Sequence, residues 1–177
     1  YNKNKLVPFG EFLPLENLFS KLGMKKITAG YQSFTSGKNR GVFGINNIKY
    51  LPLICYEIIY TGRLNTNNDD FDFIINISED GWFGNSIGLE QHFSHSIFRA
   101  IEEGKNLYRS SNNGISAHIN PVGKIEDKIK STQSGVIEVK NVKFIKETIF
   151  SKQGNKIFFY FLLIYITFAS FLKRKDL

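Results

Sequence analysis

The only cysteine of this sequence, Cys55, is its strongest candidate for chemistry. It lies in the run Tyr50-Leu-Pro-Leu-Ile-Cys-Tyr-Glu-Ile-Ile59, where a strand-like apolar segment carries the thiol to its end. A thiol reacts as its thiolate, so a nucleophilic cysteine needs a base or a cation nearby. An isolated cysteine is more often a small buried hydrophobe, and the residues around Cys55 are what favour the functional interpretation.

Charged residues near Cys55 and near the start of the chain are suited to complete such a site. Glu57 has the same strand parity as Cys55, so we expect the two side chains on one face of a strand. An acid in an apolar run costs desolvation energy unless it is paired, which favours a functional role, although a structural salt bridge would explain it too. Lys3 precedes the segment that leads to Glu11, and a lysine ammonium can stabilise the oxyanion of an acyl transfer.

Strands and one long helix must position these residues. Apolar residues recur at helical spacing over residues 87–103, and Gly104 follows as a C-cap. Residues 15–22 predict a short helix, and residues 28–41 predict a surface loop. Strands are predicted at residues 42–45, 48–54, 71–77, 107–111 and 115–119, with two more around Gly123 and Gly135, the second at residues 136–139. This alternation predicts a layered α/β domain.

The C-terminal segment has a different character. Residues 157–172 are 16 residues without a charge, somewhat fewer than the ~20 that span a bilayer core. Lys156 and Lys173 can extend the segment by snorkelling. The basic block 173–175 predicts a cytoplasmic C-terminus, with the folded domain on the opposite side of the membrane. The alternative is a helix buried against the domain, but such a helix rarely lacks a polar face over this length.

Composition and spacing limit the other functions. The length of 177 residues suggests one folded domain, and a single cysteine rules out an intrachain disulfide and a multi-cysteine zinc site. His92 and His95 are three residues apart on the expected helix, but no carboxylate or thiol completes a ligand set, so we expect no metal. The net charge is +7, and much of the excess of basic residues lies near the C-terminal end of the sequence. This indicates a membrane rather than nucleic acid as partner.

Several segments occur in the order known from one enzyme family. They are residues 1–14, Leu53-Ile-Cys-Tyr-Glu-Ile-Ile59, Asn76-Ile-Ser-Glu-Asp-Gly-Trp-Phe-Gly84, Gln91-His92, Arg99-Ala-Ile-Glu102 and Arg109-Ser-Ser-Asn-Asn-Gly-Ile-Ser116. Together they resemble the nitrilase-like domain of the bacterial apolipoprotein N-acyltransferases, within the nitrilase or carbon–nitrogen hydrolase superfamily. The resemblance covers nearly the whole chain. It implies a partial αββα sandwich, followed by a C-terminal transmembrane helix.

The resemblance also implies roles for individual residues. Cys55 matches the nucleophile, Lys3 the catalytic lysine, and Glu11 a second glutamate that orients the lysine. The substrate-binding residues implied by the resemblance are Tyr56, Glu57, Trp82 and Phe83, the last two in a mobile loop. No cofactor is implied. Residues 1–150 would be the C-terminal part of the catalytic domain, in the periplasm, and residues 151–177 an inner-membrane helix with a basic cytoplasmic tail.

The sequence departs from the family pattern in two ways. The general-base glutamate of the family precedes the lysine motif, on a strand that this chain does not contain, so we expect a fragment that is inactive alone. The loop reads Ser78-Glu-Asp-Gly-Trp, where the family usually has an asparagine before the aspartate and often an alanine after it.

The resemblance implies transfer of an acyl chain from a membrane phospholipid, through a cysteine thioester, to the N-terminal diacylglyceryl-cysteine of a lipoprotein. One alternative is a soluble-type carbon–nitrogen hydrolase that cleaves a small amide or nitrile, although such an enzyme has no need of the apolar tail. Another alternative is a non-catalytic remnant of a truncated gene.

Overall fold

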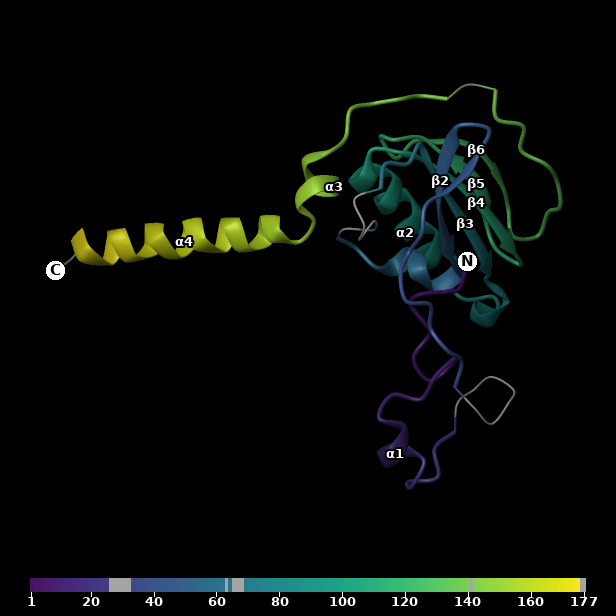
Figure 1. Ribbon diagram of the computed structural model, residues 1–177, viewed down its shortest axis with the longest axis horizontal. Helices are drawn as coiled ribbons and strands as arrows, with labels where there is room; N and C mark the ends of the chain where they lie inside the picture. The colour runs from purple at the N-terminus through teal and green to yellow at the C-terminus, as the bar shows by residue number, and fades with distance from the viewer. Residues whose placement is uncertain (26–32, 63, 65–68, 141, 176–177) are drawn as a thin grey trace.

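A six-stranded mixed sheet forms the centre of the computed structural model, which describes residues 1–25, 33–62, 64, 69–140 and 142–175 (Figure 1). The strands are β1 (Phe43–Ile45), β2 (Ile48–Ile54), β3 (Phe73–Glu79), β4 (Asn106–Asn112), β5 (Ser116–Ile119) and β6 (Ile125–Ile129). They are neighbours in chain order, with β2, β3 and β4 parallel and the outer pairs antiparallel. The predicted α/β class is confirmed.

Four α-helices accompany the sheet in the described residues: α1 (Glu16–Phe19), α2 (Gly88–Glu103), α3 (Ile149–Gln153) and α4 (Lys156–Lys175). The long helix α2 joins β3 to β4, since two parallel strands need a crossover connection. It ends as predicted at Gly104, which has φ +65° and donates its N–H to the carbonyls of Ala100 and Ile101. A glycine adopts this left-handed conformation without steric cost.

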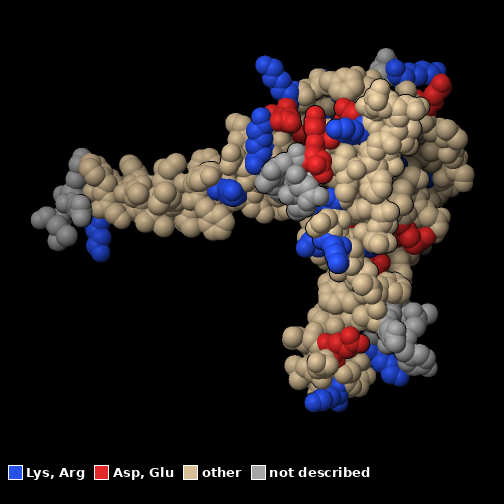
Figure 2. All heavy atoms as spheres, in the orientation of Figure 1, with Lys and Arg blue, Asp and Glu red and all other residues tan. Residues whose placement is uncertain are grey.

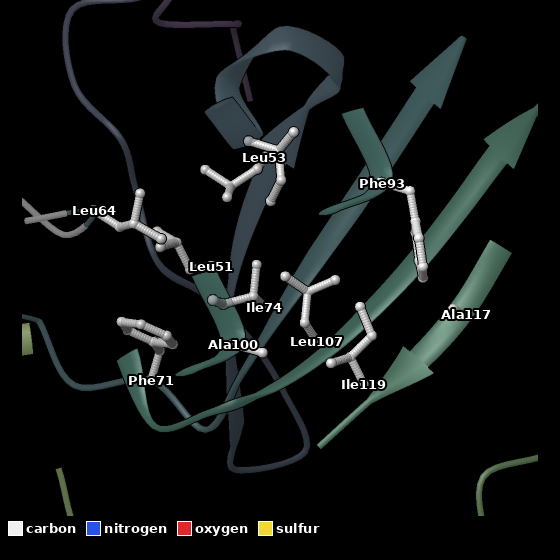
Figure 3. Close-up of a cluster of buried hydrophobic side chains, with 11 residues drawn as sticks. Leu51, Leu53, Leu64, Phe71, Ile74, Phe93, Ala100, Leu107, Ala117 and Ile119 are labelled. Carbon is white, nitrogen blue, oxygen red and sulfur yellow. The ribbon is translucent and has the colours of Figure 1, made fainter. Parts of the chain in front are cut away.

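The core lies between the sheet and α2 (Figure 3). Alternate residues of a strand point to the same face, and this places Leu51, Leu53 and Ile74 opposite Phe93 and Ala100 of the helix. Complete burial of a leucine or isoleucine side chain contributes roughly 1.5–3 kcal/mol. This packing fixes the ends of β2 and β3, from which the candidate site is built.

One sequence prediction is wrong, and another lies partly outside the described residues. The strand predicted at residues 136–139 is wrong, because this segment pairs with no strand in the described structure and Val136 is 93% exposed. Residues with high β propensity form a strand only where a neighbouring strand can accept their hydrogen bonds. Of the surface loop predicted at residues 28–41, residues 28–32 lie outside the described part, and residues 33–41 contain no helix or strand.

Helix α4 extends away from the sheet domain and follows α3 (Figure 1). Its segment Lys156–Lys173 is long and apolar enough to cross a membrane, and none of that segment is buried in the structure. Figure 2 shows few charged side chains along the helix between its two ends. The alternative of a helix buried against the domain is therefore wrong, since no described part of the chain covers α4. That the helix spans a membrane stays a prediction.

Candidate active site

Cys55 lies where β2 ends and a short 3₁₀ helix, η1 (Cys55–Ile59), begins. Its φ of +50° is in the left-handed region, which costs a non-glycine residue about 1–3 kcal/mol and is found mainly at functional sites. The Sγ atom lies 3.9 Å from the carbonyl oxygen of Glu79, the last residue of β3. The thiol is thus held at the carboxyl ends of two parallel strands, where open α/β sheets commonly bind their ligands.

The prediction that Cys55 and Glu57 share a strand face is wrong, because the chain leaves β2 at Cys55 and turns into η1. The turn leaves Cys55 partly exposed and buries Glu57 completely. The Glu57 carboxylate accepts hydrogen bonds from the backbone N–H groups of Asn4 at 2.7 Å and Lys5 at 3.1 Å. Glu57 therefore anchors the segment that carries Lys3.

Lys3 and Glu11 form an ion pair. The Lys3 Nζ lies 2.7 and 2.8 Å from the two carboxylate oxygens of Glu11. The same carboxylate accepts the backbone N–H of Val7 at 2.9 Å, across the turn that joins the two residues. Only 11% of the lysine side chain and 21% of the glutamate side chain are exposed. This partial burial and the bidentate geometry hold the ammonium in one position.

Most of the predicted site residues line one cavity of about 450 Å³. Five of the seven line it, namely Glu11, Cys55, Tyr56, Trp82 and Phe83, together with Val7, Pro8, Gly10, Phe34 and His92. Lys3 and Glu57 are not in this lining, although Lys3 is bound to Glu11 and Glu57 supports the lysine segment. Most of the lining is apolar, which suits a hydrophobic ligand.

The aromatic part of the lining comes from η2 (Gly81–Phe83), a short 3₁₀ helix directly after β3. Trp82 lies on this connection, as predicted, and is 62% exposed. The Phe83 ring packs against the imidazole of His92, with 5.4 Å between the ring centroids. A large exposed indole beside an apolar cavity is a surface that a lipid chain can contact.

A buried polar cluster adjoins the cavity through His92, and no role for this cluster was predicted from the sequence. Arg109 donates to the Asp80 carboxylate at 2.6 Å, and both side chains are completely buried. His92 contacts the other Asp80 oxygen through Nδ1 at 2.8 Å, and Arg109 also donates to Asn76. Burial opposes the ionisation of Asp80, but hydrogen bonding from His92 and the charge of Arg109 hold its pKa well below the usual range. The carboxylate is therefore ionised at neutral pH.

Sequence signals for this cluster were present. Asp80 directly follows a buried strand, and Arg109 interrupts the apolar part of the next one. In the register of the sheet Asn76 lies beside Arg109, so the polar residues share one face. Among the described residues no group of three histidine, cysteine, aspartate or glutamate side chains is placed to hold a metal ion.

On the expectation from the sequence that Cys55 is acylated and Lys3 stabilises the oxyanion, the substitution Glu11→Gln should slow acylation of Cys55 by about 10²–10³-fold, the cost of losing one preorganised oxyanion donor. The neutral amide cannot hold the Lys3 ammonium as the carboxylate does. Pre-steady-state acylation of Cys55, followed by mass spectrometry, measures the effect. Glu90→Gln is the matched control, because Glu90 is an exposed residue in the first turn of α2. Equal acylation rates in the two variants would contradict the role of Glu11.

The sequence is similar to known proteins over most of its length. It is 42% identical over 157 residues to the apolipoprotein N-acyltransferase of Rickettsia prowazekii, covering 88% of this chain and 31% of that protein. It is 40% identical over 184 residues to the apolipoprotein N-acyltransferase of Rickettsia bellii, covering 99% and 36% respectively. The chain thus spans about a third of the length of these relatives.

The fold has solved relatives as well. An amidase from Nesterenkonia sp. AN1, whose active-site cysteine was modified by acrylamide, superposes with a TM-score of 0.50 at 14% identity. The superposition covers 74% of this chain and 47% of the amidase, so it supports the fold alone. The sequence profile of the carbon–nitrogen hydrolase family matches residues 1–141. Because this match covers most of its length, the chain belongs to the carbon–nitrogen hydrolase family.

Proposed function

We propose that this chain is the part of an apolipoprotein N-acyltransferase that carries the nucleophile. The observation that carries the proposal is one apolar cavity lined by both Cys55 and Glu11, with Lys3 bound to Glu11. The 36–43% identity to proteins named apolipoprotein N-acyltransferase supports the same assignment. The acyl donor is a membrane phospholipid, and the acceptor is the N-terminal diacylglyceryl-cysteine of a lipoprotein.

The first half-reaction acylates the enzyme. A carboxylate base removes the thiol proton, and the Cys55 thiolate attacks the ester carbon of the phospholipid, so that a C–S bond forms. The Lys3 ammonium stabilises the oxyanion of the tetrahedral intermediate. The C–O bond then breaks, and the leaving lysophospholipid alkoxide takes the proton from the base. The base is proposed to lie in the part of the relatives' sequence that this chain does not span.

The second half-reaction transfers the acyl group. The acceptor amine attacks the thioester carbon, a C–N bond forms, and one amine proton passes to the base. The C–S bond breaks and its electron pair returns to the sulfur, which regenerates the thiolate. A thioester keeps enough acyl-transfer potential for an amine to displace it, and the apolar lining of the cavity limits competing hydrolysis by water.

The proposed arrangement in the cell follows from α4. Residues 1–150 belong to a catalytic domain on the periplasmic face of the bacterial inner membrane, and residues 151–177 form a membrane-crossing helix with a cytoplasmic end. The support is an apolar segment, Lys156–Lys173, with no described residue packed over it, and the basic residues that follow its apolar stretch. The exposed Trp82 beside the cavity is positioned to contact lipid.

Steady-state kinetics on the full gene product in detergent test the proposal. With phospholipid and a diacylglyceryl-cysteine peptide both varied, an acyl-enzyme mechanism predicts parallel lines in double-reciprocal plots. The competing hydrolase function predicts release of ammonia from small amides and no acylated peptide. Intersecting lines, or amide hydrolysis without peptide acylation, would contradict the transferase.

A further inference from the structure

His92 combines three properties that no other cavity-lining residue shares in the described structure. It lies in the wall of the Cys55 cavity, it is only 4% exposed, and its Nε2 has no hydrogen-bond partner among the described residues. A buried polar atom without a partner has lost the hydrogen bond that it makes in water, so such an atom calls for an explanation. A position beside a nucleophile suggests that a ligand is the missing partner.

The neighbours of His92 decide which kind of ligand group fits. The Nδ1 atom lies 2.8 Å from an Asp80 oxygen, and an ionised carboxylate can only accept hydrogen bonds. Nδ1 therefore carries the proton. In the neutral ring, Nε2 then presents a lone pair, so it can only accept a hydrogen bond.

We infer that His92 Nε2 accepts a hydrogen bond from the amine of the acyl acceptor, which makes His92 an acceptor-binding residue. This inference rests on the proposed transferase function. The ester carbonyl of the phospholipid has no donor to offer, whereas a primary amine has N–H groups. The Phe83 ring packs against the imidazole in a tilted arrangement, and both side chains line the cavity of Cys55. The Asp80–Arg109 pair holds the imidazole in the required tautomer.

Substitution of His92 by asparagine separates this role from a structural one. The asparagine amide can still donate to Asp80, as Nδ1 does, but it has no atom at the position of Nε2. We expect the KM for a diacylglyceryl-cysteine peptide to rise by about 10-fold, with acylation of Cys55 by phospholipid within about twofold of the wild type. His118→Asn is the matched control, because His118 is also 4% exposed but its Nε2 lies 3.1 Å from Asn106 Oδ1.

A second measurement needs no variant. In the wild-type full gene product with ¹⁵N-labelled histidine, the Nε2 resonance of His92 should shift when the acceptor peptide is added. It should not shift with phospholipid alone. An unchanged acceptor KM in His92→Asn, an equal loss in both half-reactions, or an unmoved Nε2 resonance would overturn the inference. Failure of the wild type to form an acyl-enzyme would instead overturn the proposed function, and this inference with it.

Discussion

Replacement of Cys55 by alanine is expected to abolish acyl transfer, with a loss of about 10³-fold or more, because Cys55 is the only cysteine of the sequence and supplies the thiolate of the proposed acyl-enzyme. The fold should survive the change. The thiol is partly exposed, and its only hydrogen-bond contact recorded within the described structure is the weak one to the Glu79 carbonyl at 3.9 Å. Alanine accepts the left-handed backbone at this position about as well as cysteine does.

Transfer of a labelled acyl chain to a diacylglyceryl-cysteine peptide measures this effect, and a thermal melt of the same preparation checks the fold. Cys55→Ser is the conservative comparison, since its hydroxyl keeps the size but is far less acidic than a thiol. A Cys55→Ala enzyme that is folded and keeps more than about a tenth of the wild-type activity would place the nucleophile elsewhere.

The largest effect on stability is expected from Asp80→Asn. This change removes the charge that balances Arg109, whose side chain is completely buried. Removing one partner of a buried ion pair typically costs about 3–5 kcal/mol, because the other charge stays behind without compensation. Urea unfolding followed by tryptophan fluorescence would measure the loss, using Trp82. Glu126→Gln, in the exposed pair with Lys124, is the control and should change stability little.

The same ion pair predicts how stability depends on pH. The pKa of Asp80 is lowered in the folded protein, from an ordinary value of 3.8. Its contribution is therefore fully present well above pH 3.8 and is lost as the pH falls through and below that value. Asp80→Asn should flatten this part of the stability curve. If the variant and the wild type lose stability equally in acid, the low pKa assigned to Asp80 is contradicted.

The double variant Asp80→Asn/Arg109→Met distinguishes pairing from other effects of the substitution. With both charges removed, no buried ion is left without compensation, so part of the lost stability should return. Strictly additive losses from the two changes would show that the pair makes no net interaction.

Elements with a strong local signal could be predicted from the sequence. The helix at residues 87–103 has both a 3.6-residue apolar period and a C-cap glycine, and it matches α2 within one residue. The strand predicted at residues 136–139 has suitable residues but no partner, and pairing depends on distant parts of the chain. The turn at Cys55 was missed for a related reason. Its apolar residues continue past the strand end. In the structure the buried Glu57 carboxylate accepts the backbone N–H of Ile54 at 2.8 Å across the turn, and also those of Asn4 and Lys5.

The residues that line the candidate cavity could largely be named from the sequence, but their arrangement could not, and their roles stay predictions. Motifs identified Cys55, Lys3 and Glu11, and the structure places two of these in one cavity, with the third bound at its wall. The segment Gln91-His92 was among the matched motifs, but no role for His92 could be predicted, because a histidine on an apolar helix face looks the same in sequence whether or not both of its nitrogens are paired. Only the contact of Nδ1 with Asp80 and the unpaired Nε2 distinguish it.

Intact-protein mass spectrometry of the full gene product, incubated with phospholipid in detergent, tests the central claim most directly. The account predicts a mass increase of one acyl chain that hydroxylamine removes, that the acceptor peptide also removes, and that Cys55→Ala lacks. A folded wild-type protein that acylates the peptide without ever carrying a hydroxylamine-labile chain on Cys55 would contradict the account.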